Sequence, residues 1–450
     1  MNDSDSKAFK RRVGAERVVL MMPFNVAMVA RIRGNVEVRR LGGVVEQLRK
    51  RHALLAVRVF FDENNVAWFV SEGVPAFHPH IIRRHSEDQW IEHIEAKLKN
   101  AFPLEEGPLV RFTLIHSPGL SELIVCAHHA VCDGLSLAYL IRDILQHLGD
   151  PDRPVEILPE PPPIDPGTVP SPPTTKPLAQ KIINIINRKW LRKNIRFDRN
   201  DREKLHRIFW EKRGNVKLLP WTVSQEMTDA LAARCRKEEV TVNTALWAAF
   251  LAAQHDVQAP LKTYQWRSAL AVNTRNRLNV PVGEAFGFYA SSLTVRLKYW
   301  PRKDFWENAR HLHRQIHSEL DRTDLFRMLR AEFLPPGLLD SLYFSKYGLI
   351  DSRISNRLLK KMGWHRITYG YAITNVGRID MPDVYGPLRL EALHGPSVYS
   401  DVEEKIIGVI TVKGSISFMM TFNETTISTH DARQIRDFAM QHLLNAVDVS

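Results

Sequence analysis

The chain has 450 residues, of which 44% are hydrophobic and 25% charged, so it can bury two cores and is not predominantly disordered. Its three cysteines are too few and too scattered for a disulfide framework or a four-ligand zinc site, and they fit a reducing compartment. The N-terminus is polar, and no run approaches the roughly 18 apolar residues that would span a bilayer. We therefore expect a soluble, cytoplasmic protein.

The net charge of +12 is concentrated in one segment. Between residues 176 and 217 there are 14 Lys or Arg against four acids, so this segment holds most of the excess. A local basic patch attracts phosphate, acidic protein or anionic lipid, and charge alone does not select among them.

The first part of the chain predicts two strand-and-helix pairs. Apolar residues alternate over 22–32, which predicts a strand, and they recur at helical spacing over 41–48. Two short apolar runs, 110–115 and 123–127, predict a hairpin. A helix over 137–148 follows directly, with Gly149 placed to end it.

A proline-rich stretch marks the clearest boundary, because 11 of the 26 prolines lie within 151–177. Such a stretch favours an extended, semi-rigid connector. We therefore expect an N-terminal subdomain over 1–150, a linker over 151–177, a basic amphipathic segment over 178–217 and a C-terminal subdomain over 218–450.

In the second part, Thr241 is a candidate N-cap for a helix that runs to about residue 254. Strands are predicted over 291–297, 406–412 and 416–422, followed by a final helix over 429–444. The elements lack a regular βαβ rhythm, and no glycine-rich phosphate loop opens a helix, which disfavours Rossmann and P-loop folds. The pattern predicts a mixed α/β layered fold.

The most informative motif is the heptapeptide 128–134, His-His-Ala-Val-Cys-Asp-Gly, which directly follows the predicted hairpin. A neutral imidazole at the end of a strand can accept a proton from an incoming hydroxyl or amine. The residues alone leave other interpretations open. Both histidines can be core residues bonded to backbone carbonyls, and Asp133 can orient an imidazole as in catalytic triads.

Two further chemistries are disfavoured. A metal site built from the two histidines and Asp133 is disfavoured because neighbours on a strand point to opposite faces. A serine hydrolase would need a Gly-x-Ser-x-Gly elbow, which the sequence lacks.

The heptapeptide resembles the HHxxxDG signature of the superfamily that includes chloramphenicol acetyltransferase, plant acyltransferases, nonribosomal peptide condensation domains and free-standing polyketide-associated acyltransferases. Further segments resemble this superfamily in order along the chain. They are residues 51–55 (RHPxL-like), 102–111 (PFDLxxGPLxR-like), 272–278 (VDxRxRL-like), 286–287 (the start of FGN) and 374–378 (SNxGR-like).

The resemblance implies a pseudo-dimer of two chloramphenicol-acetyltransferase-like halves, each a mixed sheet with packed helices, with an active-site tunnel between them. His129 would be the general base that takes the acceptor's proton and returns it to the departing sulfur, without an acyl-enzyme. The resemblance gives Asp133 a structural role in an ion pair with Arg275. The other interpretation of Arg275 is an ordinary charged residue on the solvated surface.

The other site residues have less specific implied roles. The resemblance implies a structural role for His128 and a steric requirement for glycine at Gly134. Asn375 can hydrogen-bond the substrate or can be an ordinary turn residue. The chain departs from the family pattern at Ala56, where an arginine is frequent, and at Phe288, where the asparagine of FGN would stand.

The implied reaction moves an acyl group from acyl-CoA or an acyl or peptidyl carrier protein to a small-molecule alcohol or amine, in lipid, polyketide or other secondary metabolism. Alternatives are a stand-alone condensation enzyme and a non-catalytic carrier-binding protein. We expect no resident cofactor, no metal, no nucleic-acid partner and a monomer.

Residues 178–196 predict a basic amphipathic helix. Such a helix can lie on an anionic membrane, here the inner membrane surface, or its apolar side can pack on the C-terminal half.

Overall fold

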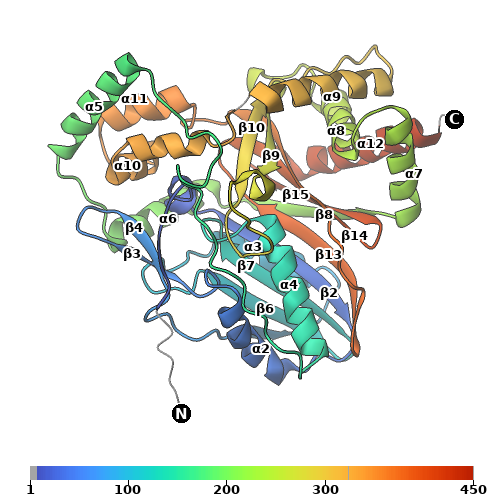
Figure 1. Cartoon of the computed structure of the whole chain (residues 1–450). Coiled ribbons are helices and arrows are strands. Elements are labelled where there is room, and N and C mark those ends of the chain that lie inside the picture. Colours follow the sequence, from blue (N-terminus) through green and yellow to red (C-terminus); the bar gives the residue numbers. More distant parts are fainter. Residues whose placement is uncertain (1–7, 323, 449–450) are drawn as a thin grey trace.

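The computed structural model describes residues 8–322 and 324–448. In these residues the chain forms two six-stranded sheets with packed helices and one small three-stranded sheet (Figure 1). The small sheet has the order β1 (Lys10–Arg12), β4 (Ala67–Val70), β3 (Arg58–Phe61), and the short helix α1 (Arg17–Leu20) follows its first strand.

The first large sheet has the order β12-β13-β2-β7-β6-β5. Only the pair β5–β6 is parallel. Helices α2, α3 and α4 pack on or beside it. The bounds are β2 (Asn25–Arg33), α2 (Val38–Arg51), β5 (His80–Arg83), α3 (Gln89–Lys99), β6 (Val110–Ser117), β7 (Leu120–His128), α4 (Gly134–Gly149), β12 (Val384–Tyr385) and β13 (Leu388–Val398).

The second large sheet has the order β10-β9-β11-β14-β15-β8, with β11 parallel to both of its neighbours. Its helices bury a second apolar core, centred on α8. The bounds are β8 (Val216–Val223), α7 (Gln225–Lys237), α8 (Val242–Gln258), β9 (Ser268–Asn273), β10 (Ala290–Val295), α9 (Phe305–Arg322), β11 (Tyr369–Arg378), β14 (Glu403–Val412), β15 (Ser415–Asn423) and α12 (Thr429–Asp448).

The proline-rich stretch contains no helix or strand up to residue 176 and lies against the rest of the molecule. Ile164 and Val169 are buried, and the Tyr289 hydroxyl donates to the Pro162 carbonyl at 2.7 Å. Helices α5 (Pro177–Leu191) and α6 (Arg199–Arg213) follow it, and α10 (Pro336–Lys346) and α11 (Arg353–Met362) form a further helical pair.

The structure confirms the mixed α/β fold with two halves and places strands and helices where the apolar periodicities predicted them. Thr241 caps α8 by accepting a hydrogen bond from the Thr244 amide at 3.1 Å. One expected boundary differs from the structure: β12 and β13, assigned to the C-terminal subdomain, complete the first sheet. The reason is that β2 offers a free edge, which β13 pairs in antiparallel register.

In the part of the chain that the structure describes, no helix has the length and apolar content needed to cross a bilayer.

Candidate active site

The site lies at the end of β7, where the chain turns into α4. The turn holds its shape because Asp133, with extended backbone, caps the helix by accepting from the Ser136 amide at 2.7 Å. His129 lies inside this turn, and its amide donates to the Phe24 carbonyl at 2.8 Å. The loop around Phe288 belongs to the other half and closes over the turn.

The imidazole of His129 is held in one tautomer. Its Nδ1 lies 2.8 Å from the Cys132 carbonyl oxygen, and because a carbonyl can only accept, Nδ1 must donate. In the neutral ring the lone pair is therefore on Nε2. The residue is partly exposed, and its ring meets Phe288 edge to face with centroids 5.1 Å apart. The tautomer is the one that a proton acceptor at Nε2 requires.

The electrostatic surroundings keep this ring neutral. Burial lowers the pKa of His129 below its usual 6.5, and the Cys132 carbonyl and the charge of Asp133 offset only part of that effect. The ring is thus uncharged at neutral pH and ready to accept a proton.

His128 has a different environment from its neighbour. It is buried, its Nδ1 accepts from the Ala130 amide at 3.2 Å, and its ring packs edge to face on Phe102. Burial, with a smaller contribution from His129, lowers the pKa of His128 to about 3. These contacts fit a structural role. Across the described ranges there is no group of three or more His, Cys, Asp or Glu placed to hold a metal ion.

The structure brings Asp133 and Arg275 together from 142 residues apart in sequence. Nη2 of Arg275 lies 3.1 and 3.2 Å from the two carboxylate oxygens, and the Tyr289 amide donates to Oδ2 at 3.1 Å. Nη1 donates to the carbonyls of Gly283 and Ala285 at 3.2 and 2.8 Å. Arg275 is buried, which excludes a solvated surface charge. The carboxylate therefore ties the two halves together, and the ring of His129 is oriented by a backbone carbonyl instead.

Sequence reasoning missed Ser136, which is completely enclosed in this cluster. Its hydroxyl lies 2.9 Å from Oδ1 of Asp133 and 2.7 Å from Nη2 of Arg275, and it accepts from the Gly287 amide at 3.1 Å. The available signal was its position three residues after a helix-capping aspartate. Phe288 was also missed, because it was noted only as a departure from the family pattern.

Gly134 lies at the start of α4, and Asn375 lies on β11, next in sequence to Val376, which faces that glycine. A Cβ on Gly134 would lie 3.0 Å from both the Pro396 and the Val376 side chains, so the position favours glycine for steric reasons. Asn375 sits at a bulge in β11, where its Oδ1 accepts from the Gly377 amide at 2.9 Å and its Nδ2 donates to Asn243 at 3.2 Å. Both contacts fit a turn residue, and a substrate contact by Asn375 stays a prediction.

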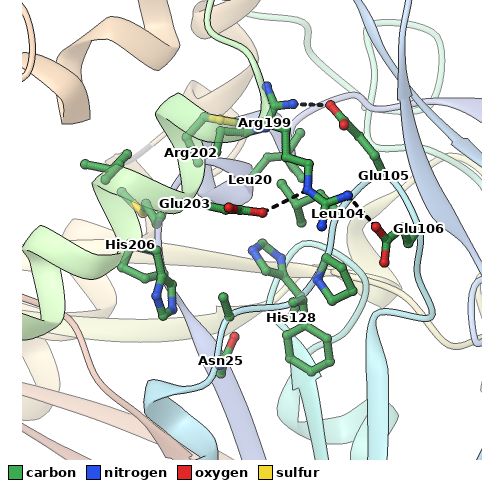
Figure 2. A pocket seen from close by; sticks show the side chains of 17 residues that line it. Leu20, Asn25, Leu104, Glu105, Glu106, His128, Arg199, Arg202, Glu203 and His206 are labelled. Carbon is green, nitrogen blue, oxygen red and sulfur yellow. Dashed lines mark hydrogen bonds and ion pairs between the residues drawn. The ribbon is translucent and has the colours of Figure 1, made fainter.

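A pocket of about 320 Å³ opens beside the motif, between the segment 20–25, the loop 101–106 and helix α6. Among the described residues that line it, His128 is present and His129 is not. Figure 2 shows His128 near two arginines of α6. Arg202 pairs with Glu105, and Arg199 pairs with Glu106 and, at 2.8 Å, with Glu203.

Comparison with known proteins agrees with this architecture. Residues 22–150 match the family model "Condensation domain". The chain is similar to FR901469 synthetase of Dothideomycetidae sp. (strain 11243), with 25% identity over 126 residues, which is 28% of this chain and 1% of that protein. The chain thus matches only a small part of the curated relatives, whose whole activities do not transfer to it.

The likeness of fold extends over the whole chain. Polyketide synthase associated protein 5 from Mycobacterium tuberculosis has a TM-score of 0.62 at 14% identity, covering 98% of both chains. The TRI3 trichothecene 15-O-acetyltransferase from Fusarium sporotrichioides has a TM-score of 0.66 at 12% identity, covering 99% of this chain and 96% of that one. The match over residues 22–150 and the shared fold are consistent with the resemblance to the HHxxxDG superfamily.

Proposed function

We propose that this protein is an acyltransferase that moves an acyl group from a thioester donor, acyl-CoA or an acyl carrier protein, to an acceptor hydroxyl. The family match and the fold support a transferase of the condensation or acyltransferase kind. The single observation that carries the finer proposal is the fixed tautomer of His129, with Nδ1 bonded to a carbonyl and Nε2 free to accept.

The reaction needs one proton acceptor that becomes a proton donor. The acceptor hydroxyl gives its proton to Nε2 of His129 while its oxygen bonds to the thioester carbonyl carbon. The carbon–sulfur bond then breaks, and the imidazolium returns the proton to the leaving sulfur. The products are an ester and a free thiol, and the base ends in its starting state. A positioned base of this kind contributes roughly 10²- to 10⁴-fold in rate.

The surrounding residues position the base and keep it neutral. Asp133 and Arg275 hold the turn between the halves through their buried ion pair. Among the described contacts, the His129 ring donates to the Cys132 carbonyl and not to the Asp133 carboxylate. Phe288 packs on that ring and limits its contact with water. We regard Asp133, Arg275 and Phe288 as positioning residues.

The pocket beside His128 has a lining that suits an apolar substrate group. The pocket is lined by His128, the chain neighbour of the proposed base, and not by His129 itself. Aliphatic side chains line part of it, among them Leu20, Met22 and Leu205. An acyl chain fits such a lining better than a charged group does.

The second candidate is a stand-alone condensation enzyme that forms an amide or ester from a carrier-bound donor. The match of residues 22–150 to the condensation-domain model favours it. The two candidates share the base and differ in the acceptor atom and the donor carrier.

The test is mass spectrometry of the purified protein with panels of acyl-CoAs, acyl carrier proteins, alcohols and amines. We expect acceptor-dependent loss of the thioester by the wild-type chain, and a rate roughly 10²- to 10⁴-fold lower for His129→Ala. His430→Ala on the exposed face of α12 is the matched control and should transfer at the wild-type rate.

Two results would overturn the proposal. One is transfer by His129→Ala at the wild-type rate. The other is the absence of transfer by both proteins while both keep full binding to a carrier protein, which would favour a non-catalytic carrier-binding role.

A further inference from the structure

Helix α5 carries an apolar stripe that the described part of the protein leaves uncovered. Leu178, Ile182 and Ile185 are 72%, 52% and 44% exposed, and their i, i+4, i+7 spacing places them on one face. Of the eleven exposed large hydrophobic side chains among the described residues, four lie in this one helix, the fourth being Leu191. Single exposed apolar residues are ordinary, whereas a cluster of this kind marks an interaction site.

The opposite side of α5 fixes the helix in place. Trp190 is 2% exposed, and its Nε1 would lie 3.6 Å from a Cβ on Gly337 at the start of α10. Asn187 donates to the Phe333 carbonyl at 2.8 Å. The alternative that the apolar side of this helix packs on the C-terminal half therefore holds for Trp190 and not for the stripe, which faces outward.

The charge around the stripe has one sign. Between residues 176 and 197 the sequence has seven Lys or Arg and no Asp or Glu. Lys181, Arg188, Lys189, Arg192 and Lys193 are all exposed. All charged side chains of the segment that carries the stripe are therefore positive.

Helix α11 adds positive charge at the same corner of the molecule (Figure 1). It packs on α10, as α5 does, with the Ser341 and Ser355 hydroxyls 2.6 Å apart. Its exposed side chains include four cations and one apolar residue, namely Arg353, Arg357, Lys360, Lys361 and Met362.

We propose that α5 docks on an anionic membrane surface. The stripe formed by Leu178, Ile182 and Ile185 would enter the boundary between headgroups and acyl chains, and the flanking Lys and Arg would lie among the lipid phosphates. An acidic protein would complement the cations but would need a groove shaped for the projecting stripe. An anionic bilayer complements both features without a shaped partner.

The test is flotation of the full chain with vesicles of phosphatidylcholine alone or with about one-third phosphatidylglycerol. We expect binding to the anionic vesicles only, and weaker binding as salt rises. Ile182→Ser/Ile185→Ser should weaken this binding by about tenfold or more, because two side chains no longer enter the interface. Phe438→Ser/Leu444→Ser on α12 removes two exposed apolar groups elsewhere and should bind as the wild type does.

The cations are tested separately. Lys181→Glu/Lys189→Glu should weaken anionic binding by about thirtyfold or more, because each lost cation contributes roughly 1 kcal/mol and each new carboxylate is repelled by the surface. Lys50→Glu/Lys237→Glu, at exposed positions elsewhere, should leave the binding unchanged. His129→Ala should bind vesicles like the wild type, so a failure of the acyltransferase proposal and a failure of membrane docking are distinguishable.

Three outcomes would overturn the proposal. They are no binding of the wild type to anionic vesicles, equal binding to neutral ones, and full binding by the Ile182→Ser/Ile185→Ser protein. Retention on an acidic carrier protein that depends on Ile182, without vesicle binding, would assign the surface to a protein partner.

Discussion

The two halves of the molecule each contain a hairpin followed by a turn and a helix: β6, β7 and α4 in the first, and β14, β15 and α12 in the second (Figure 1). The first turn presents His129. At the end of β15 stands Asn423, whose Oδ1 accepts from the Thr425 amide and hydroxyl at 2.9 and 2.7 Å. Its Nδ2 donates to the Arg213 carbonyl at 2.8 Å.

The two turns share a fold but differ in whether the side chain at the end of the strand keeps a free proton acceptor. In the second turn, both ends of the Asn423 amide make structural contacts: Oδ1 closes the turn, and Nδ2 bonds the end of α6. In the first, a backbone carbonyl takes only one nitrogen of His129 and leaves the other as an acceptor. The first turn also depends on the opposite half, through Arg275 and the Tyr289 amide.

The largest effect on stability is expected from Asp133→Ala. It removes a helix cap and leaves the buried guanidinium of Arg275 without its carboxylate, a change that typically costs about 3–5 kcal/mol. Chemical denaturation measures this loss. The control is Asp198→Ala, which removes the exposed capping box of α6 and should cost about 1 kcal/mol. Equal losses for the two variants would show that the ion pair between the halves does not stabilise the fold.

A smaller effect, on stability alone, is expected from Asn423→Ala. The buried turn loses several hydrogen bonds, and the free energy of unfolding should fall by about 1–3 kcal/mol. The rate of acyl transfer, measured with saturating donor at a temperature where the variant is folded, should stay at the wild-type level. If transfer falls as far as in His129→Ala, the second turn takes part in the reaction and the contrast between the halves fails.

The smallest effect concerns the pH dependence of transfer. The base acts in its neutral form, so kcat/KM should be constant near neutral pH and fall as the pH drops through the lowered pKa of His129. Phe288→Asn admits water beside the ring and should raise the pKa of His129 toward 6.5. The acid limb of the profile, which is the fall of kcat/KM at low pH, should then move to higher pH. Phe288→Leu keeps the site apolar and should leave the limb in place. An unmoved limb in Phe288→Asn would show that this ring does not set the pKa.

Local patterns predicted the elements whose own residues carry a signal. These signals are the alternation in β2, the apolar run in β7, the helical spacing in α4, and the apolar segment with a candidate N-cap in α8. They did not predict that β13 joins the first sheet, because the choice of a distant partner is not contained in a strand's own pattern. In β13 the register also shifts between Leu390 and Ala392 and between His394 and Ser397. These irregularities weaken the period-2 signal of a strand.

The site divides in the same way. The heptapeptide 128–134 could be recognised from the sequence alone. The partner of Asp133, Arg275, came from the family resemblance, because residue spacing within the chain does not indicate it. The contacts of Ser136 and Phe288 arise only when the two halves meet, so single-sequence reasoning had no means of finding them.

The pairing of β13 with the first sheet has a consequence for engineering. A cut in the linker would leave the first sheet without its two strands β12 and β13 and would remove Pro396, which packs against Gly134 at the start of α4. Chimeras that swap halves between related enzymes should therefore carry residues 384–398 along with the amino-terminal donor, so that the histidine turn keeps its original neighbour.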